Sequence, residues 1–166
     1  MFEDNNISGA EFSECRKYRY ALWRIWNEGL PLIMFIGLNP STANEVENDA
    51  TIRRVISFAK VWNYGGVYMM NCFPYISTNP DDLIVNDDNE ENDHWLSIVN
   101  AFCETVVFAW GNFPIVRLKE RDKQLAGMFP NAKCLVKNKN GSPKHPLYVA
   151  KNTKLINYEM EAAKRI

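Results

Sequence analysis

Leu30-Pro-Leu-Ile-Met-Phe-Ile-Gly-Leu-Asn-Pro-Ser-Thr42 is the stretch that decides the fold of this chain. Its apolar run from Leu32 to Leu38 is nearly unbroken, which is typical of a strand buried on both faces. Pro40 disfavours the helical conformation at Asn39, so we expect the Asn39 amide to be held at the carboxyl end of this strand. Because ligands bind at that edge of parallel α/β sheets, we predict that Asn39 anchors a site. A plain Asn-Pro-Ser turn is the alternative.

The residues after Ser41 alternate between helical and strand patterns. Asp49 is a good N-cap for a helix that begins at Ala50, and Gly65-Gly66 marks the turn after it. Strands joined by a helix through short connections run parallel to each other. We therefore predict further parallel strands at Val67–Met70, Thr105–Trp110 and Ala132–Val136, with helices at Ala50–Trp62, about Trp95–Phe102, Pro114–Met128 and Asn152–Lys164.

The segment before the apolar run predicts one antiparallel strand. Residues Tyr18 to Trp26 alternate between two faces, and Asn27-Glu28-Gly29 is typical of a turn, so we expect a hairpin with the strand at 32–38. Residues 1–14 are expected to be a polar lead-in, for which the sequence leaves open both an ordered and a disordered state. The predicted fold is a single α/β domain over residues 1–166. It is a three-layer α/β/α sandwich with a mainly parallel four-stranded central sheet plus the antiparallel hairpin strand.

The composition excludes several classes of protein. A chain of 166 residues that is 46% hydrophobic can bury a core without covalent staples, and none of its stretches approaches a membrane span. Its amino terminus lacks the layout of a signal peptide. The cysteines at 15, 72, 103 and 134 are scattered and there are two histidines, which argues against zinc or an iron–sulfur cluster. We expect reduced thiols in the cytoplasm, and neither a metal nor a cofactor.

Charge is distributed unevenly although the net charge is −1. Residues 79–104 contain eight acidic residues and no Lys or Arg, whereas residues 117–154 contain ten Lys and Arg against two acidic residues. Such polarity either provides a phosphate-facing surface or reflects solvated helices and loops. The long polar connection at 75–91 predicts a loop that covers something. Its acidic end, Asp87–Asp93, is poorly suited to a surface pressed on phosphate.

Polar or aromatic residues stand where each predicted parallel strand ends. They are Asn39, Asn71, Trp110-Gly111 and, beyond the fourth strand, His145. Because these ends share one edge of a parallel sheet, we expect two amides, an indole and an imidazole to converge on one crevice. Taken singly, the two asparagines can cap turns, Trp110 can be core and His145 can be a loop residue. Their equivalent positions favour a shared site.

Five segments in a fixed order carry a resemblance to a known family. They are Phe35-Ile-Gly-Leu-Asn-Pro-Ser-Thr42, Asp49-Ala-Thr-Ile-Arg-Arg54, Val67-Tyr-Met-Met-Asn71, Val107-Phe-Ala-Trp-Gly111 and Gly141-Ser-Pro-Lys-His-Pro-Leu-Tyr148. Over roughly residues 18–150 the series resembles that of an uncharacterised bacterial and phage family, domain of unknown function 1643. That family name implies no activity.

More distantly, the same series is similar to the uracil-DNA glycosylase superfamily. Gly37-Leu-Asn-Pro40 resembles its Gly-Ile-Asn-Pro-Gly loop, and Met69-Met-Asn71 its Leu-Leu-Asn strand end. Phe108-Ala-Trp-Gly111 resembles a Leu-Trp-Gly strand end, and His145-Pro146 the opening of a His-Pro-Ser loop. The resemblance implies a uracil-DNA glycosylase-like fold in which Asn39 orients water, Asn71 reads the base and His145 donates to the leaving base.

The resemblance also implies which residues contact the substrate. Beside Asn71, the residues expected to bind it are Gly37, Pro40, Ser41, Trp110 and Gly111. Phe73 is a further candidate because it could stack on a base, although a core or loop role suits an aromatic there as well.

Basic residues and one leucine complete the predicted site. Arg54 and Lys144 are candidates for phosphate contacts, and an exposed helix face is the alternative for the Arg53-Arg54 pair. The serine of the His-Pro-Ser loop is missing, since Leu147 follows Pro146. Leu147 could act as a wedge into DNA, but we expect it to be buried.

Functions of different kinds fit these residues. The first is an N-glycosidase that releases a base from a nucleotide or nucleic acid. An amide activates water less well than a carboxylate does, so such an enzyme should be slow or need a weakened bond. The second is a non-catalytic module that binds a nucleobase, nucleotide or nucleic acid in the same pocket. A hydrolase or transferase acting on another small molecule is a third, because fold does not fix function.

Overall fold

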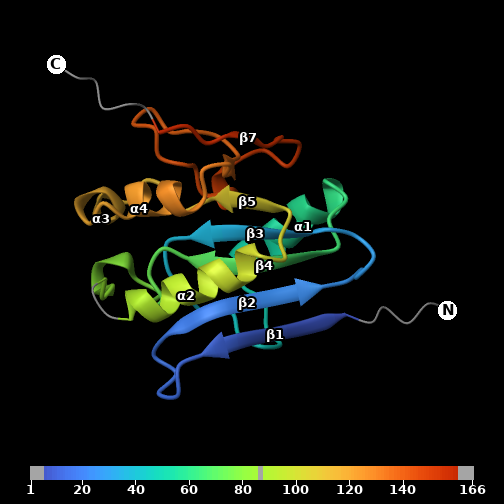
Figure 1. Cartoon of the computed structure of the whole chain (residues 1–166), viewed down its shortest axis with the longest axis horizontal. Helices are drawn as coiled ribbons and strands as arrows, with labels where there is room; N and C mark the ends of the chain where they lie inside the picture. Colours follow the sequence, from blue (N-terminus) through green and yellow to red (C-terminus); the bar gives the residue numbers. More distant parts are fainter. Residues whose placement is uncertain (1–5, 86–87, 161–166) are drawn as a thin grey trace.

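A mixed seven-stranded sheet forms the centre of the computed structural model, which describes residues 6–85 and 88–160 (Figure 1). The strands lie in the spatial order β1-β2-β4-β3-β5-β6-β7. Their bounds are β1 Ile7–Phe12, β2 Arg19–Ile25, β3 Leu32–Gly37, β4 Gly66–Asn71, β5 Thr105–Phe108, β6 Lys133–Cys134 and β7 Ile156–Asn157. The apolar run of the sequence is β3, and it lies in the middle of the sheet.

Four strands run parallel, as predicted. β3 pairs with β4 on one side and with β5 on the other, and β5 pairs with β6. The chain passes from β3 through α1 (Ala50–Val61) to β4, and then through α2 (Asn89–Asn100) to β5 on the opposite side of β3. The winding therefore changes direction at β3, and the carboxyl end of such a strand is the usual place for a ligand.

The predicted hairpin between β2 and β3 is wrong, because β2 pairs antiparallel with β4 instead. β4 lies between β2 and β3 in the sheet, and Gly65, directly before β4, contacts the turn that connects these two strands. Its carbonyl oxygen accepts a hydrogen bond from the Asn27 N–H at 3.0 Å, and its own N–H donates to the Pro31 carbonyl at 2.7 Å. A Cβ on residue 65 would lie 1.9 Å from the Asn27 carbonyl oxygen, so only glycine permits this approach.

The amino-terminal segment is part of the sheet, since residues 7–12 of the predicted polar lead-in form a strand. They form β1, which pairs antiparallel with β2. β1 is an edge strand whose residues are mostly exposed or half-buried, so its sequence carries little of the apolar alternation of an inner strand. Residues 1–5 of the predicted lead-in lie outside the described residues.

The helix predicted at Asn152–Lys164 is not found in its described part, residues 152–160. That segment instead contains β7, which pairs antiparallel with β6. Tyr158 fixes the extended path, because its N–H donates to the Ala132 carbonyl at 2.9 Å and its ring packs edge-on against Phe108. The remainder of the predicted helix, residues 161–164, lies outside the described residues.

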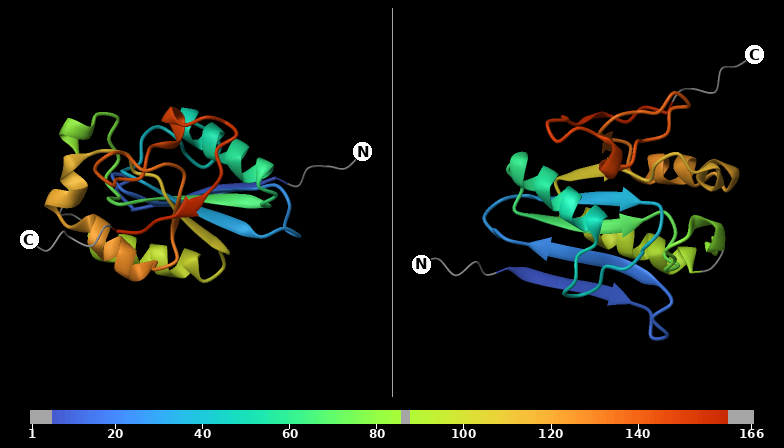
Figure 2. Two further views of the ribbon diagram at one scale, coloured as in Figure 1. Left: turned by 90° about the horizontal axis from the view of Figure 1, so that it is seen from above. Right: turned by 180° about the vertical axis from the view of Figure 1, so that it is seen from behind.

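Two apolar cores lie on opposite faces of the sheet (Figure 2). α1 packs on one face, while α2, α3 (Pro114–Leu118) and α4 (Arg121–Met128) pack on the other. A single helix is predicted where α3 and α4 lie. They are separate because Glu120, with a φ of 53°, interrupts the right-handed helical path. The predicted N-cap of α1 is confirmed, since Asp49 Oδ1 accepts from the Ile52 N–H at 2.9 Å.

Candidate functional site

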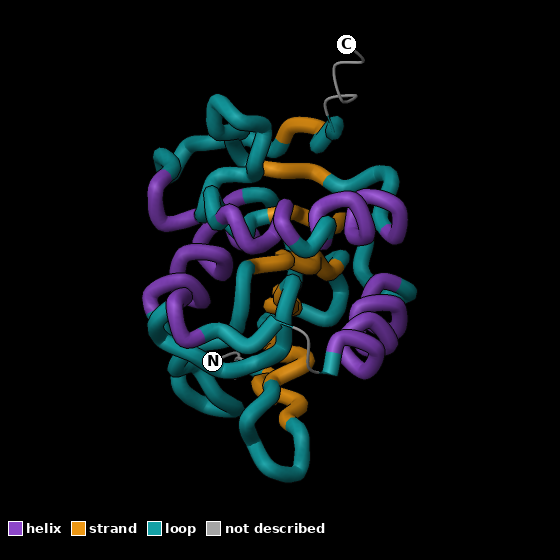
Figure 3. The backbone as a smooth tube through the Cα atoms, turned by 90° about the vertical axis from the view of Figure 1, so that its left-hand side faces the viewer, coloured by secondary structure: helices purple, strands orange, loops and turns teal. Residues whose placement is uncertain are grey.

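A small cavity lies at the carboxyl ends of β3 and β4, the edge of the sheet that faces the viewer in Figure 3. It has a volume of ≈ 150 Å³. Five residues that the sequence predicts for one site line it, namely Gly37, Asn39, Ser41, Asn71 and His145. The first three come from β3 and the loop after it, Asn71 ends β4, and His145 precedes the short helix η2 (Pro146–Tyr148).

The Asn39 amide is held in one orientation. Its Nδ2 donates to the backbone carbonyls of Pro40 at 2.9 Å, Ser77 at 2.8 Å and Tyr75 at 3.4 Å. These bonds tie the long connection after β4 to the end of β3. Within the described part of the chain Oδ1 of Asn39 has no hydrogen-bond partner, so it is the acceptor that Asn39 offers to the cavity.

Asn71 brings an unpaired donor to the cavity. The residue is 2% exposed, and its Nδ2 is buried without a hydrogen-bond partner. Its backbone carbonyl is held by the buried Asn92 of α2, whose Nδ2 donates to it at 2.9 Å. A buried donor left unpaired costs about 1–3 kcal/mol. An acceptor atom of a ligand that paired with Nδ2 of Asn71 would remove this cost.

His145 presents a neutral donor. Its Nδ1 accepts a hydrogen bond from the Leu147 N–H at 3.2 Å. A neutral imidazole that accepts at Nδ1 carries its proton on Nε2, which is then the donor. Burial lowers the pKa of His145 below its usual 6.5, and the carboxylate of Asp49 raises it only in part. The ring is therefore mostly neutral at pH 7.

A second, larger cavity of ≈ 400 Å³ adjoins the first and shares Thr51, Phe113 and His145 with it. Gly111 and Lys144 line this second cavity and not the first. Gly111 has a φ of 81°, a conformation that favours glycine. The two cavities together fall in the range of about 300–1,000 Å³ that is usual for small-molecule sites.

Three residues predicted to bind substrate, Pro40, Phe73 and Trp110, line neither of these two cavities. Trp110 is 1% exposed and packs against Phe108 with ring centroids 4.6 Å apart, in the core on the α2 side. Phe73 is also 1% exposed and belongs to the same core. Pro40 is buried, and its carbonyl accepts from Asn39. Their apolar side chains are used in packing.

Arg54 has backbone partners in the protein, and Leu147 differs from expectation. Arg54 Nε donates to the Pro146 carbonyl at 3.2 Å, and the same guanidinium donates to the Val149 carbonyl. Arg54 therefore fastens the η2 segment to α1, and its phosphate contact stays a prediction. Leu147, expected to be buried, is 42% exposed and lines the second cavity beside His145.

Two charged residues of the first cavity are missed by the sequence reasoning. Arg19 is 3% exposed; its Nη1 donates to the Ala43 carbonyl at 3.0 Å, while its Nε is buried without a partner. Burial lowers the pKa of Arg19 to about 10, so it stays charged at pH 7. Asp49, predicted only as an N-cap, also lines the cavity. The available signal for Arg19 was an arginine at the start of a strand whose other residues are mostly apolar or aromatic.

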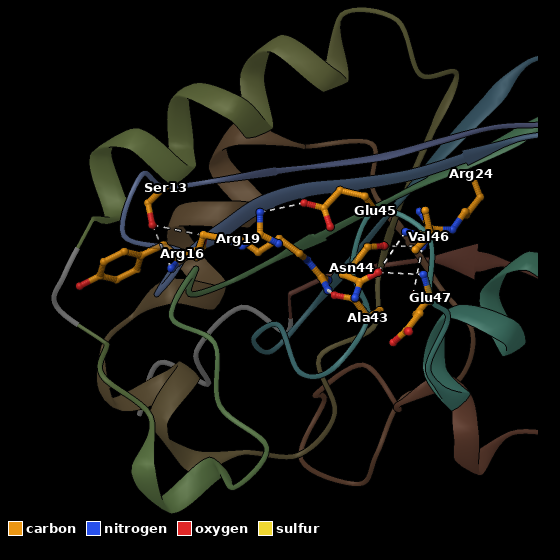
Figure 4. A network of polar contacts seen from close by, with 10 residues as sticks. Ser13, Arg16, Arg19, Arg24, Ala43, Asn44, Glu45, Val46 and Glu47 are labelled. Carbon is orange, nitrogen blue, oxygen red and sulfur yellow. Dashed lines mark hydrogen bonds and ion pairs between the residues drawn. The ribbon is translucent and has the colours of Figure 1, made fainter.

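Arginines also hold the loop of residues 43–48, which connects β3 to α1 (Figure 4). Arg16 forms an ion pair with Glu45 at 2.8 Å. Arg24 is buried and donates to the backbone carbonyls of Asn44 and Glu47 and to Oδ1 of Asn48. The loop leads directly to Asp49, so these contacts help to fix the position of its carboxylate.

The acidic stretch Asp87–Asp93, predicted to be poorly suited to a surface pressed on phosphate, is used in part to dock α2. Asp88 accepts a hydrogen bond from the Tyr20 hydroxyl, and Asp93 pairs with the buried Arg121 of α4. Glu90 is exposed, and Asp87 lies outside the described residues. Glu91 accepts a hydrogen bond from Trp95 Nε1–H at 3.2 Å. Three of these carboxylates therefore have structural partners.

Comparison with family models decides to which proteins the chain is related. A model described as "Protein of unknown function (DUF1643)" matches residues 19–147. The chain belongs to the DUF1643 family. The range covered by the DUF1643 model includes every residue that lines the first cavity, from Arg19 to His145, and leaves out β1 and β7. No curated protein and no solved structure matches the chain.

Three further features of this DUF1643 protein concern clusters of metal-binding side chains, membrane spans and cysteines. Among residues 6–85 and 88–160, no group of three or more His, Cys, Asp or Glu side chains could hold a metal ion. None of the helices in the described part is long and apolar enough to cross a membrane. The cysteines are free thiols, of which Cys72 and Cys134 are buried.

Proposed function

We propose that this DUF1643 protein binds a nucleobase or nucleotide in the first cavity and hydrolyses its N-glycosidic bond. The observation that carries the proposal is that Asn39, Asn71 and His145 line one cavity. They offer it an acceptor, an unpaired donor and a neutral donor, respectively. Glycosidic cleavage needs a positioned water, contacts to the edge of the base and a donor to the departing base.

The proposal includes a structural relationship to the uracil-DNA glycosylase superfamily. It is supported by the parallel order of β4, β3, β5 and β6 and by helices on both faces of the sheet, which suit a three-layer α/β/α sandwich. The position of Asn39 and Asn71 at the ends of adjacent parallel strands also supports it.

In the proposed reaction a water molecule attacks the sugar carbon that carries the base. Asn39 Oδ1 accepts a hydrogen bond from this water, and the Asp49 carboxylate takes its proton. The general base is thus the Asp49 carboxylate and not the Asn39 amide, which is too weak a base. The carbon–nitrogen bond breaks, its electron pair goes to the base, and Nε2–H of His145 donates to the base oxygen on which charge develops.

The second cavity suits the rest of a nucleotide. It adjoins the first at His145, and Lys144 is the basic residue in its lining. We assign Lys144 as the contact for a phosphate group. Tyr148 is 74% exposed and Leu147 42% exposed at its rim, so both are placed to touch a sugar or a neighbouring base.

Measurement of free base tests the proposal. The purified protein is incubated with nucleosides and with single- and double-stranded DNA that carries uracil or damaged bases, and released base is quantified by chromatography. We expect release that falls about 10²-fold or more in Asn39→Ala and in His145→Gln. Asn131→Ala, at an exposed position near β6, is the control and should keep full activity. Release that is equal in all four proteins would contradict the proposal.

A non-catalytic binding module is the second candidate. It is favoured by the Asn39 amide nitrogen, which already holds the connection at residues 75–77 and so has a structural task independent of any water. This candidate predicts that a nucleobase or nucleotide raises the melting temperature in a saturable way. It also predicts that no free base appears.

A further inference from the structure

Arg19 is a buried cation whose hydrogen-bonding capacity the described chain uses only in part. Its side chain lines the first cavity at 3% exposure. Nη1 has the Ala43 carbonyl as a partner, whereas Nε is buried without one. The described residues supply no partner for Nη2 either. Nε and Nη2 form one edge of the planar guanidinium, so two parallel donors remain free side by side.

Leaving this edge unpaired is costly. Removal of a charged group from water costs several kcal/mol unless hydrogen bonds replace the lost hydration. Asp49 is close enough to raise the pKa of Arg19, but the described residues contain no ion pair between the two. Asn71 Nδ2, a second buried donor without a partner, lines the same cavity. The cavity is therefore rich in donors that lack acceptors.

We propose that Arg19 recognises the base, and that its free edge binds two adjacent acceptor atoms of the kind that guanine presents at O6 and N7. This rests on the proposed function and names the class of base. The bidentate contact of arginine with O6 and N7 is a common way to select guanine. Adenine has a donor beside N7. In uracil the acceptors O2 and O4 are separated by the N3–H donor. Cytosine presents O2 and N3 side by side on its pairing edge, so cytidine is the competitor that the test has to separate from guanosine.

The charge of the cavity favours a neutral base edge over an oxyanion. A phosphate or carboxylate would also offer two acceptors to Arg19. The Asp49 carboxylate lines the same small cavity and would repel such an anion.

Titration calorimetry of the whole chain with nucleosides tests this assignment. Guanosine, adenosine, cytidine, uridine and inorganic phosphate are each titrated into the wild type. Guanosine is expected to bind at least about tenfold more tightly than adenosine and uridine, since a good bidentate pair gives about 1–3 kcal/mol of discrimination. Tighter binding of cytidine than of guanosine would overturn the proposal. Arg19→Lys keeps the charge but lacks the fork, so it should lose this preference. Arg53→Lys, the same change at an exposed position, should keep it.

Two modified nucleosides test the same contact on the wild-type protein, so that the result does not depend on whether a variant folds. Affinity of the wild type for 7-deazaguanosine, which lacks N7, should fall about tenfold, while inosine, which keeps O6 and N7, should bind like guanosine. Equal binding of guanosine and 7-deazaguanosine would overturn the proposal, as would phosphate that binds at the expense of guanosine. If uridine binds best and Arg19→Lys leaves its affinity unchanged, the base-binding function stands and the role of Arg19 fails. If no nucleoside binds, both fail.

Discussion

Asn71 Oδ1 lies against the backbone of Gly37, where a Cβ would stand only 3.1 Å from it. The two residues are register partners at the carboxyl ends of β4 and β3. A Cβ on residue 37 would also stand 2.7 Å from Met69 Cε. The absence of a side chain at residue 37 therefore leaves the space in which the Asn71 amide sits beside the cavity.

Gly37→Ala is expected to displace the Asn71 amide and so weaken nucleoside binding. The added methyl group should also lower the free energy of unfolding by about 1–3 kcal/mol, because it overpacks a buried position. Urea unfolding and nucleoside titration measure the two effects. Gly127→Ala in α4 is the matched control, since no atom lies within 4 Å of its added Cβ; it should stabilise the helix by up to about 1 kcal/mol. Unchanged affinity in Gly37→Ala would contradict the role given to Asn71.

Asn92→Ala should destabilise the fold through the end of β4. The side chain of Asn92 is fully buried, and its loss leaves the Asn71 carbonyl without its 2.9 Å hydrogen bond. We expect the free energy of unfolding to fall by about 1–3 kcal/mol. Asn100→Ala, at an exposed position of the same helix, should change it by no more than about 0.5 kcal/mol. Equal effects of the two substitutions on the free energy of unfolding would mean that the hydrogen bond from Asn92 to the Asn71 carbonyl contributes nothing to stability.

His145 should make stability depend on pH. Burial places the pKa of the folded state below the usual 6.5, so the unfolded chain binds this proton more readily. The contribution of the neutral ring is therefore fully present above about pH 6.5 and is lost as the pH falls through the folded pKa. Urea unfolding from about pH 8 to about pH 5 should show a smaller loss for His145→Gln than for the wild type.

NMR titration of the His145 ring measures directly the lowered pKa on which this dependence of stability on pH rests. Its pKa should lie below 6.5 in the wild type. Asp49→Asn should lower the pKa of His145 further, because the carboxylate of Asp49 favours the charged ring. A pKa of His145 that rises in Asp49→Asn would show that the two side chains are not arranged as described.

Arg54→Gln should loosen the segment that carries His145. The substitution removes the hydrogen bonds to the carbonyls of Pro146 and Val149, at a cost of about 1–3 kcal/mol. Amide hydrogen exchange at residues 145–149 should then rise about tenfold or more. Arg53→Gln, one position earlier and exposed, is the control and should leave this exchange unchanged. If both variants exchange like the wild type, Arg54 does not hold the segment.

The parallel centre of the sheet could be predicted because its signals are local. The apolar run of β3 and the Asp49 N-cap can both be recognised within a few residues of sequence. The edges could not be predicted in this way. Both residues of β7 are exposed, and its path depends on hydrogen bonds to β6 and on the packing of Tyr158 against Phe108. Neither partner is close to it in the sequence.

The residues of the site could likewise be predicted only in part. Asn39, Asn71 and His145 could be placed together because parallel strands end at one edge of a sheet. The partners of a long side chain do not follow from that rule. Arg54 looks like a phosphate ligand in the sequence, yet it meets the carbonyl of Pro146, 92 residues away. Arg19 looks like an ordinary strand residue, yet it is buried at the cavity.

The side-chain amide signals of Asn71, followed by ¹⁵N-edited NMR as each of the four common nucleosides is added, report on the cavity itself. We predict that at least one nucleoside shifts these signals in a saturable way, because its acceptor gives the buried Nδ2 a partner. The signals of the exposed Asn131 side chain should stay in place. Asn71 signals that remain unchanged with every nucleoside would contradict the assignment of this cavity as a base-binding site.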